Sequence, residues 1–266
     1  MAIITISRDS HSHGQEIAEK VCRKLGYSCI SREILLEASE HFNIPEIKLK
    51  SALHDAPAAL DRFTYGKERY LAFIQSEFLD HARKDNLVYH GLAGHFMVRG
   101  VAHCLKVRVA ADMEDRVNLE IQRENVSRDE ALKTLTEEDE ERRKWSWTLW
   151  GHDPWDSILY DLILHLNKLS IENVVDIICL TAKMDRFAAV PESQKVVDDL
   201  HLAAKVKTSL VMKYPSCTVN ADGRIVGVNV VSDITQETAI IEEIEQLTTG
   251  LPGVDEVRVS VTPHGF

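Results

Sequence analysis

The sequence contains few cysteines, and no two of them form a C-x-x-C pair. Five cysteines in 266 residues are an odd number, and they lie far apart along the chain. This usage argues against a disulfide framework and fits reduced thiols in a cytosol, as core or incidental residues. The five are Cys22, Cys29, Cys104, Cys179 and Cys217.

The chain also lacks an excess of basic residues and any long apolar run. Its formal net charge of -11 argues against a protein that coats nucleic acid or an anionic membrane, since both need a net basic face. No apolar stretch approaches the length of a membrane span, and the N-terminus enters a strand-like run without a basic leader. We therefore expect a soluble, cytoplasmic protein with no nucleic-acid partner, in which local basic pockets can still bind small anions.

Strand-like runs alternate with long helical patterns in the first two thirds of the chain. This alternation predicts an α/β fold, in which helices cover both faces of a parallel sheet. The first crossover contains three helical patterns and is therefore long enough to form a substrate lobe. The strand-like runs are Ile3–Ser7, Leu87–His90, Leu105–Val109 and Leu162–Leu166, and the three helical patterns are 32–42, 45–54 and 67–84.

The character of the sequence changes after a connector that contains Pro191. A helical pattern is followed by the order strand, turn, strand, helix, strand. Valines alternate with other residues at 226–230, and again with polar residues at 256–261. Each strand is therefore expected to have one buried and one solvent-exposed face. Residues from about 193 onward therefore predict a small α+β unit with its own core.

The segment TISRDSHSHGQEIAEKVCRKLG, residues 5–26, predicts a strand, a tight loop and a helix N-terminus. This is the layout of a phosphate cradle, in which backbone N–H groups and the helix dipole attract an anion. The loop has His11 and His13 where such cradles usually have glycine, and no lysine follows Gly14. An ordinary surface loop is one alternative, and a metal site on the two histidines, without an evident third ligand, is another.

Six stretches, in the right order, resemble the cytidylate kinase-like branch of the nucleoside monophosphate kinases, which are P-loop phosphotransferases. They are IITISRDSHSHGQEIAEKVCRKLGY, SREILLEA, LVYHGLAGH, KVRVAADMEDRV, SRDEALKTLTEEDEERRKW and YDLILHLNKLSIENVVDII. This resemblance implies a P-loop kinase-like domain over 1–185. The stretches NADGRIVGVNVVSD and LPGVDEVRVSV resemble a BON domain over 193–266, an αββαβ module often associated with membrane or ligand binding.

The kinase resemblance implies transfer of the γ-phosphoryl group of ATP, with Mg²⁺, to a nucleotide such as CMP. It implies that Arg32 helps to place the acceptor. It assigns the donor phosphates to Ser12, His13, Gly14 and Gln15, and the charges of a closing lid to Arg116, Arg123, Asp139, Arg142 and Arg143. Phosphoryl transfer depends mostly on positioning and charge neutralisation, which lid arginines supply. The alternative for these arginines is pairing with glutamates 137–141 along the helix surface.

Three departures from the family pattern weaken the expected phosphate sites. The loop keeps one glycine of the usual GSGG stretch, Ser31 replaces the aspartate of an Asp-Arg pair, and Leu92 replaces the arginine of a Gly-Arg pair. That arginine is expected to contact the phosphoryl acceptor, and leucine offers no fork of donors for phosphate. The alternative function is therefore a catalytically weak or inactive protein that binds a nucleotide or anion and acts as a regulator through its BON-like module.

Three tryptophans, Trp145, Trp147 and Trp150, follow the arginines assigned to the lid. Trp147 and Trp150 share a helix face, and tryptophan is favoured at packed interfaces. We expect a core or dimer contact rather than stacking on a base, so a homo-oligomer is one expected state.

Overall fold

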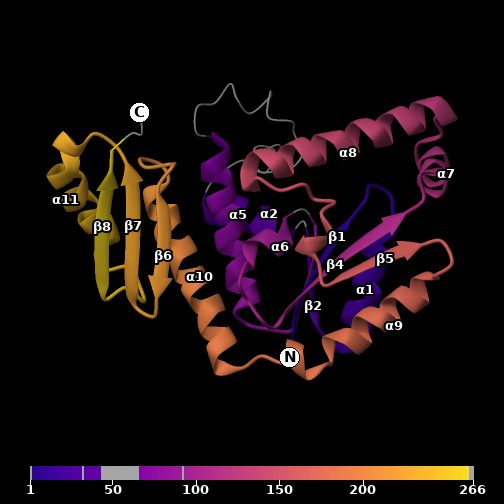
Figure 1. The fold of residues 1–266 in the computed structure, drawn as a ribbon, viewed down its shortest axis with the longest axis horizontal. Coiled ribbons are helices and arrows are strands. Elements are labelled where there is room, and N and C mark those ends of the chain that lie inside the picture. Colours follow the sequence, from indigo (N-terminus) through magenta and orange to yellow (C-terminus); the bar gives the residue numbers. More distant parts are fainter. Residues whose placement is uncertain (1, 32, 43–65, 92, 264–266) are drawn as a thin grey trace. The chain divides into compact units, whose positions relative to one another are not determined.

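The computed structural model describes residues 2–31, 33–42, 66–91 and 93–263. The chain divides into two compact units, which are labelled by element in Figure 1. The first unit contains the residues up to Glu33 and Lys84–Val190, and the described parts of the second are 34–42, 66–83 and 191–263. The segment inserted after the second strand therefore groups with the C-terminal part of the chain.

The first unit is built on a five-stranded parallel sheet in the order β2-β3-β1-β4-β5. The predicted parallel α/β fold is thus confirmed. The sequence did not predict the edge strand β2, because three residues are too few to show a pattern. The strands are β1 (Ile3–Arg8), β2 (Ser28–Ile30), β3 (Leu87–His90), β4 (Cys104–Ala111) and β5 (Leu162–Leu166).

Helices cover both faces of this sheet. Helices α1 and α9 pack on the face formed by Ile4, Ile6 and Val107, whose side chains are fully buried. Helix α6 packs on the opposite face, where Gly94 approaches the side chain of Thr5. The helices of this unit are α1 (Gly14–Leu25), α6 (Gly94–Met97), α7 (Met113–Glu124), α8 (Arg128–Trp150) and α9 (Ile171–Ala182).

Helix α8 carries three of the residues assigned to a lid, Asp139, Arg142 and Arg143, and its N-terminus begins with a capping box. The Ser127 hydroxyl accepts from the Glu130 N–H while the Glu130 carboxylate accepts from the Ser127 N–H. Near the end of α8, Trp145 is buried and lies edge-on to Trp150, with ring centroids 4.9 Å apart. Trp147 is 63% exposed, so the expected packing is confirmed for the other two tryptophans. For Trp147 the core contact is wrong, and the dimer contact stays a prediction.

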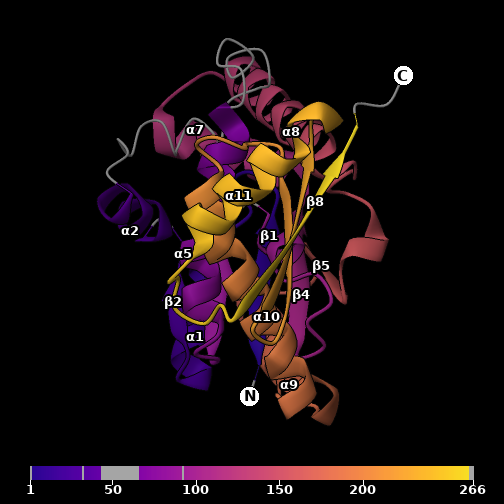
Figure 2. The ribbon, with the colours of Figure 1, turned by 90° about the vertical axis from the view of Figure 1, so that its left-hand side faces the viewer.

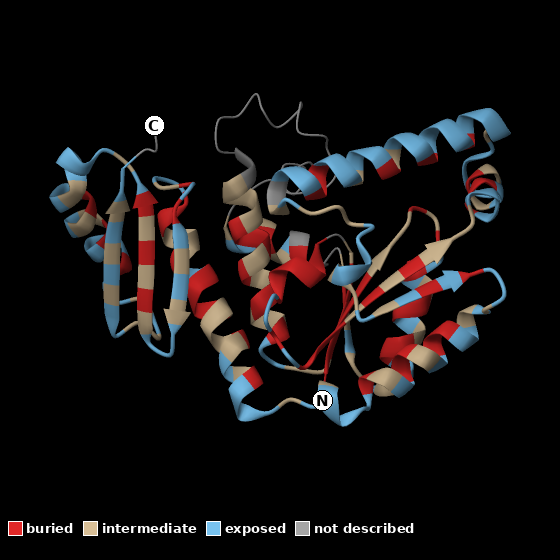
Figure 3. Cartoon of the chain, in the orientation of Figure 1, coloured by how far each residue is buried: buried red, intermediate tan, exposed pale blue. Residues whose placement is uncertain are grey.

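The second unit contains a three-stranded sheet, with β6 antiparallel and β8 parallel to the central β7. Helices α10 and α11 pack on one face of it, over a core that includes Val206, Val226, Val228 and Ile244. Figure 2 shows α11 running beside the strands, and Figure 3 shows that buried residues concentrate on β7. The small α+β unit is confirmed. Its elements are α2 (Glu33–His41), α5 (Gly66–Ala82), α10 (Pro191–Leu210), β6 (Thr218–Asp222), β7 (Ile225–Val231), α11 (Glu237–Thr248) and β8 (Glu256–Thr262).

Some predictions fall where the structure cannot test them. The helical pattern at 45–54 and the residues Arg32 and Leu92 lie outside the described residues. The division into domains 1–185 and 193–266, and the BON-like identity of the second, stay predictions. Among the helices that the structure describes, none has the length and apolar character needed to cross a bilayer.

Candidate functional site

The candidate site lies at the carboxyl end of the central strand β1. Strand β1 has β3 on one side and β4 on the other, and ligands of open α/β sheets bind in the crevice at such a position. The loop from Asp9 to His13 leads from this strand into α1. Because α1 has no side-chain cap, its first N–H groups have no acceptor among the described residues and point toward this loop.

The loop keeps the backbone shape of a glycine-rich loop without the glycines. His11 and His13 both have φ of 54°, in the left-handed region that glycine adopts without strain. Ser12 is buried and donates its hydroxyl to the Asp9 carbonyl oxygen at 2.8 Å. The loop is therefore held by its own contacts, and the Ser12 hydroxyl faces the loop rather than a ligand.

Position 14 needs a glycine because a neighbouring side chain lies close to it, not because of its backbone conformation. A Cβ atom at this position would collide with the Cδ atom of Arg8, whose aliphatic part crosses the start of α1. The Arg8 guanidinium donates to Nδ1 of His90 at 3.3 Å. The missing side chain of Gly14 thus lets Arg8 lie against the N-terminus of α1.

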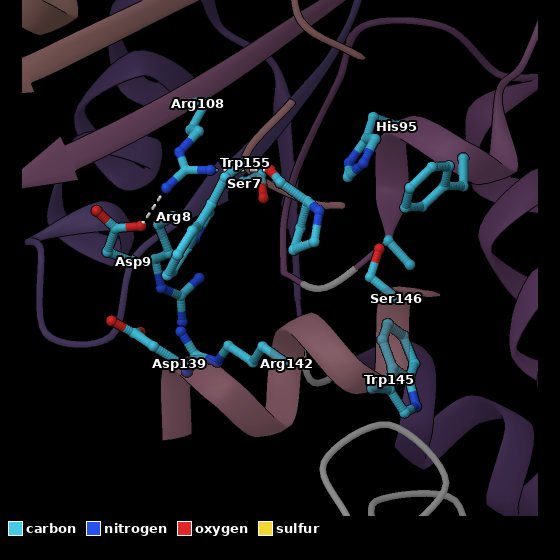
Figure 4. A pocket seen from close by; sticks show the side chains of 13 residues that line it. Ser7, Arg8, Asp9, His95, Arg108, Asp139, Arg142, Trp145, Ser146 and Trp155 are labelled. Atoms are coloured by element: carbon cyan, nitrogen blue, oxygen red, sulfur yellow. Dashed lines mark hydrogen bonds and ion pairs between the residues drawn. The ribbon is translucent and has the colours of Figure 1, made fainter. Parts of the chain in front are cut away.

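Arg8 and Arg142 form the cationic part of an inner pocket, which Figure 4 shows from close by. Burial lowers the pKa of both guanidinium groups, and the charge of Arg142 lowers that of Arg8 further. Arg142 approaches Glu138 at 3.8 Å, but Arg8 has no carboxylate partner among the described residues. Two cations therefore converge near the start of α1. The carboxylates of Glu138, Asp139 and Asp9 act on Arg142, whereas none of the described carboxylates pairs with Arg8.

Arg116 lies on the other side of the loop and is fully paired. It is 4% exposed, donates through Nε to the Ser10 carbonyl oxygen at 2.7 Å, and forms a two-bonded ion pair with Asp139 at 2.8 and 2.9 Å. This guanidinium connects α7, α8 and the loop. Its geometry is that of a strong bidentate pair, so its charge is already satisfied within the protein.

Arg108 of β4 contributes a second ion pair at the inner pocket. It donates to Asp9 at 2.7 Å and to the Pro154 carbonyl oxygen at 2.8 Å. Its guanidinium carbon also lies 5.8 Å from the ring centroid of Trp155, and that of Arg143 lies 4.9 Å from the same ring. Trp155 therefore interacts with two cations, and it lines this pocket together with Arg108 (Figure 4).

His95 of α6 provides a neutral polar group in the same pocket. It is 6% exposed, and no described residue bonds to its Nε2 atom. Burial, with the nearby charges of Lys106 and Arg108, lowers its pKa to about 3. The imidazole is therefore uncharged at neutral pH and can exchange a hydrogen bond with a ligand.

The inner pocket and the adjoining groove differ greatly in size. The inner pocket has a volume of about 30 Å³, which is room for one or two water molecules. The groove on the other side of the loop has a volume of about 430 Å³, within the range of small-molecule sites. His11 and His13 border this groove together with Asn118, Gln122 and Asn167. The groove therefore has the volume of a small-molecule site, whereas the inner pocket is too small for a nucleoside.

The structure brings together only part of the predicted set. Ser12, His13 and Gly14 lie in the loop or at the start of α1, but Gln15 is exposed and donates to Glu19 at 2.9 Å. Of the residues assigned to a lid, Asp139 and Arg142 line the inner pocket, and Arg116 pairs with Asp139.

The two remaining lid residues are exposed. Arg123 pairs with Glu124 at 3.1 Å and donates to Nδ1 of His11 in the loop at 3.3 Å, and Arg143 pairs with Asp153 at 2.5 Å. The structure therefore separates the predicted lid arginines into one that faces the pocket, one that is buried in an ion pair, and two on the surface.

Sequence reasoning did not select Arg8, Asp9, His95 or Arg108. Arg8 and Asp9 follow a buried strand directly, which is the position where α/β proteins place ligand contacts. Arg108 interrupts the apolar strand between Val107 and Val109. The positions of Arg8 and Asp9 after a buried strand, and of Arg108 within an apolar strand, are the sequence features that could have identified these residues. Among the described residues, no three His, Cys, Asp or Glu side chains form a group fit for a metal, so His11 and His13 gain no third ligand there.

A crystal structure with a TM-score above 0.5 agrees with this fold. The crystal structure of an uncharacterized protein from Eubacterium ventriosum is similar at 18% sequence identity and a TM-score of 0.53, over 68% of this chain and 98% of that one. A shikimate kinase from Bacteroides thetaiotaomicron is similar at 13% identity and a TM-score of 0.44, over 69% of this chain and 99% of that one. No curated protein matches the sequence.

The comparison with protein families is more specific. The model of the cytidylate kinase-like family matches residues 3–168, which is more than half of the chain and includes the loop, β3, β4, α7 and α8. The chain belongs to the cytidylate kinase-like family.

Proposed function

We propose that the first unit binds ATP and transfers its γ-phosphoryl group to a nucleotide such as CMP. The observation that carries this proposal is the convergence of Arg8 and Arg142 at the N-terminus of α1, where Arg8 has no carboxylate partner among the described residues. A partly buried cation without a counter-charge is costly. A phosphate supplies that charge and accepts both the guanidinium donors and the free N–H groups of α1.

The groove beside the loop suits the nucleoside part of the donor. Its volume is about 430 Å³, and the amide side chains of Asn118, Gln122 and Asn167 line it. These groups can donate and accept hydrogen bonds with a base and a ribose. The inner pocket, with its volume of about 30 Å³, is assigned to phosphate oxygens rather than to a whole nucleotide, with His95 as a neutral hydrogen-bonding group. Arg32 is assigned to the acceptor by resemblance alone.

The residues around the inner pocket fit phosphate oxygens better than a magnesium ion held by the protein. Mg²⁺ prefers free carboxylate oxygens and water, but Asp9 is paired with Arg108 and Asp139 with Arg116. Arginines are therefore the groups that neutralise phosphate charge in this proposal, and no step is assigned to a metal bound by these carboxylates.

A second candidate function is nucleotide or anion binding without rapid transfer, with the BON-like second unit as the output. The loop favours this candidate, because His11 and His13 carry Cβ atoms in left-handed backbone and the Ser12 hydroxyl is bonded to Asp9. These features restrict close approach of phosphate. Both candidates share the phosphate site and differ in turnover.

A ligand panel followed by a turnover assay separates the candidates. The melting temperature of the full chain is measured with ATP, tripolyphosphate, adenosine and CMP, each with and without Mg²⁺, because a ligand that binds only the folded state raises it. We expect ATP and tripolyphosphate to raise it and adenosine to have a smaller effect. ADP release that depends on CMP supports transfer, and ATP binding without ADP release supports the second candidate. No shift with any phosphate contradicts both.

A further inference from the structure

His11, in the loop between β1 and α1, has two side chains of α7 at the same ring nitrogen. Arg123 donates to its Nδ1 atom at 3.3 Å, and Oε2 of Glu120 lies 3.3 Å from that same atom. The imidazole is largely covered, with 13% of its side chain exposed. A single ring nitrogen either accepts a hydrogen bond or donates one, so His11 can serve only one of these two partners at a time.

The neutral ring of His11 serves Arg123. A guanidinium can only donate, so Nδ1 accepts from it and the ring hydrogen is on Nε2. Oε2 of Glu120 is then left without a donor. Glu120 is 6% exposed, and this oxygen has no hydrogen bond to any described residue. A buried carboxylate oxygen without a donor costs free energy, so the neutral state leaves an unused acceptor beside His11.

The protonated ring serves Glu120 instead. With a hydrogen on both nitrogens, Nδ1 donates to Oε2 of Glu120 and can no longer accept from Arg123. A hydrogen bond between a cation and a carboxylate is stronger than a neutral one. Of its described contacts, Arg123 then keeps the exposed one with Glu124 at 3.1 Å. Uptake of one proton therefore exchanges one partner of His11 for the other, and it adds a positive charge to a loop that has no lysine.

The other charged groups described around His11 are further from its ring nitrogen or already paired. Asp115 of α7 and His13 of the loop border the groove together with His11, and His13 pairs with Glu16 at 3.5 Å. Arg116 is bound in its own buried ion pair. The residues at 166–171 that line the groove are uncharged. The charged groups in direct contact with the ring are therefore the two side chains of α7.

We propose that His11 couples phosphate binding at the loop to the uptake of one proton. Neutral His11 holds Arg123, whereas protonated His11 pairs with Glu120 and leaves the loop more positive. A phosphate chain at the N-terminus of α1 favours the more positive state. The affinity for phosphate should therefore rise as the pH falls through the range in which histidine titrates, about 6.5. This inference rests on the proposed function, since the anion is the phosphate chain of the nucleotide.

The first test follows the exchange of partners without a ligand. Urea midpoints of the full chain are measured at about pH 6 and pH 8 for His11→Gln, Glu120→Gln, Arg123→Gln and the two double variants that contain His11→Gln. Double-mutant cycles then give the coupling of His11 with each partner. The coupling with Glu120 should be favourable at the lower pH and weaken at the higher one, and the coupling with Arg123 should change in the opposite direction. Couplings that do not change with pH overturn the proposal.

The second test measures the Kd for tripolyphosphate at about pH 6 and pH 8. The readout is the ratio of the two Kd values, because protonation of the ligand itself contributes equally for every protein. The ratio of the Kd at the higher pH to that at the lower pH should be about fivefold or more larger in the wild type than in His11→Gln. Glu120→Gln should reduce the ratio toward that of His11→Gln, whereas a residue that only supports the fold would change both Kd values and leave their ratio.

A matched control and a clear division of outcomes complete this test. Glu124→Gln removes the same charge from an exposed position of α7 and should keep the ratio of the wild type. An equal ratio in the wild type and His11→Gln, or an equal fall in Glu124→Gln and Glu120→Gln, contradicts the inference and leaves the phosphate site standing. Absence of tripolyphosphate binding to every protein at both pH values contradicts the proposed function, and the cycles of the first test still decide whether His11 exchanges its partners.

Discussion

Two arginines lie on opposite sides of the loop between β1 and α1, and they differ in what neutralises their charge. Arg116 donates to the Ser10 carbonyl oxygen and to both oxygens of Asp139. Arg8 donates to a histidine ring and faces the charge of Arg142. The comparison shows that similar residues differ in their pairing, since Arg116 fixes the loop and its surroundings while Arg8 is the residue that we propose binds an anion.

Loss of the paired arginine should have the largest effect on stability. In Arg116→Gln, Asp139 stays buried without its two-bonded partner, and breaking a buried pair in this way costs about 3–5 kcal/mol. The free energy of unfolding, measured by urea titration with circular dichroism, should fall by this amount. The exposed pair Arg128–Glu114 is the matched control, and Arg128→Gln should cost less than about 1 kcal/mol.

A double variant separates charge pairing from shape. Arg116→Met combined with Asp139→Leu removes both charges, and such replacements of buried pairs are often close to neutral. We expect the double variant to be more stable than Arg116→Gln. Equal losses in the two proteins would show that the contact of Arg116 with Ser10, and not the buried charge of Asp139, dominates.

The neutral His95 should make stability depend on pH on the acidic side. Its pKa is lowered to about 3 in the folded protein, against about 6.5 when unfolded. The unfolded chain binds the proton first, so this contribution is complete above pH 6.5 and is lost as the pH falls toward 3. At pH 5 the loss is about 2 kcal/mol.

The variant His95→Phe isolates this contribution, because it keeps a ring between Phe96 and Tyr160 and cannot titrate. Unfolding free energies of both proteins are compared between pH 7 and pH 5. The wild type should lose more stability than the variant over this interval. Parallel curves would show that other groups, such as His201, whose pKa burial also lowers, account for the acid sensitivity.

The residues around the two arginines also show what could be predicted from the sequence. Apolar runs and their spacing predicted β1, β3, β4 and β5, because burial of a parallel strand leaves a direct mark on composition. The charged residues of α7 and α8 were selected as one functional group. Their sequence cannot show that Arg116 and Asp139, which are 23 positions apart, pair with each other while Arg142 faces the pocket. That distinction depends on how the two helices pack.

The loop illustrates a second limit. The two histidines were recognised as departures from a glycine-rich pattern, which suggested an impaired cradle. The structure shows that His11 and His13 have left-handed backbone. The loop therefore has the shape of a glycine-rich loop, and the Cβ atoms of the two histidines strain its backbone. The role of Gly14 was also hidden, because it depends on the path of the Arg8 side chain.

Relief of that strain should give a smaller, stabilising effect. Left-handed backbone costs an L-residue about 1–2 kcal/mol, and the greater freedom of unfolded glycine offsets about 0.5–1 kcal/mol of this. His13→Gly should therefore raise the free energy of unfolding by about 0.5–1 kcal/mol. His13→Ala is the control, because it removes the exposed contact with Glu16 but keeps a Cβ atom. A gain in the alanine variant as well would mean that the imidazole, and not the backbone, is the source of the strain.

Removal of Arg8 should change stability least and binding most, which is the reverse of the expectation for Arg116. Arg8→Gln gives up the bond to His90 but also removes a cation from the neighbourhood of Arg142, so without ligand we expect a change within about 1 kcal/mol. The rise in melting temperature with tripolyphosphate should disappear, because its main cationic contact at α1 is gone. Arg143→Gln is the matched control, since that arginine is exposed and paired with Asp153, and it should keep the rise. A tripolyphosphate effect that survives in Arg8→Gln would place the anion elsewhere, and a large loss of stability without ligand would make Arg8 a structural residue like Arg116.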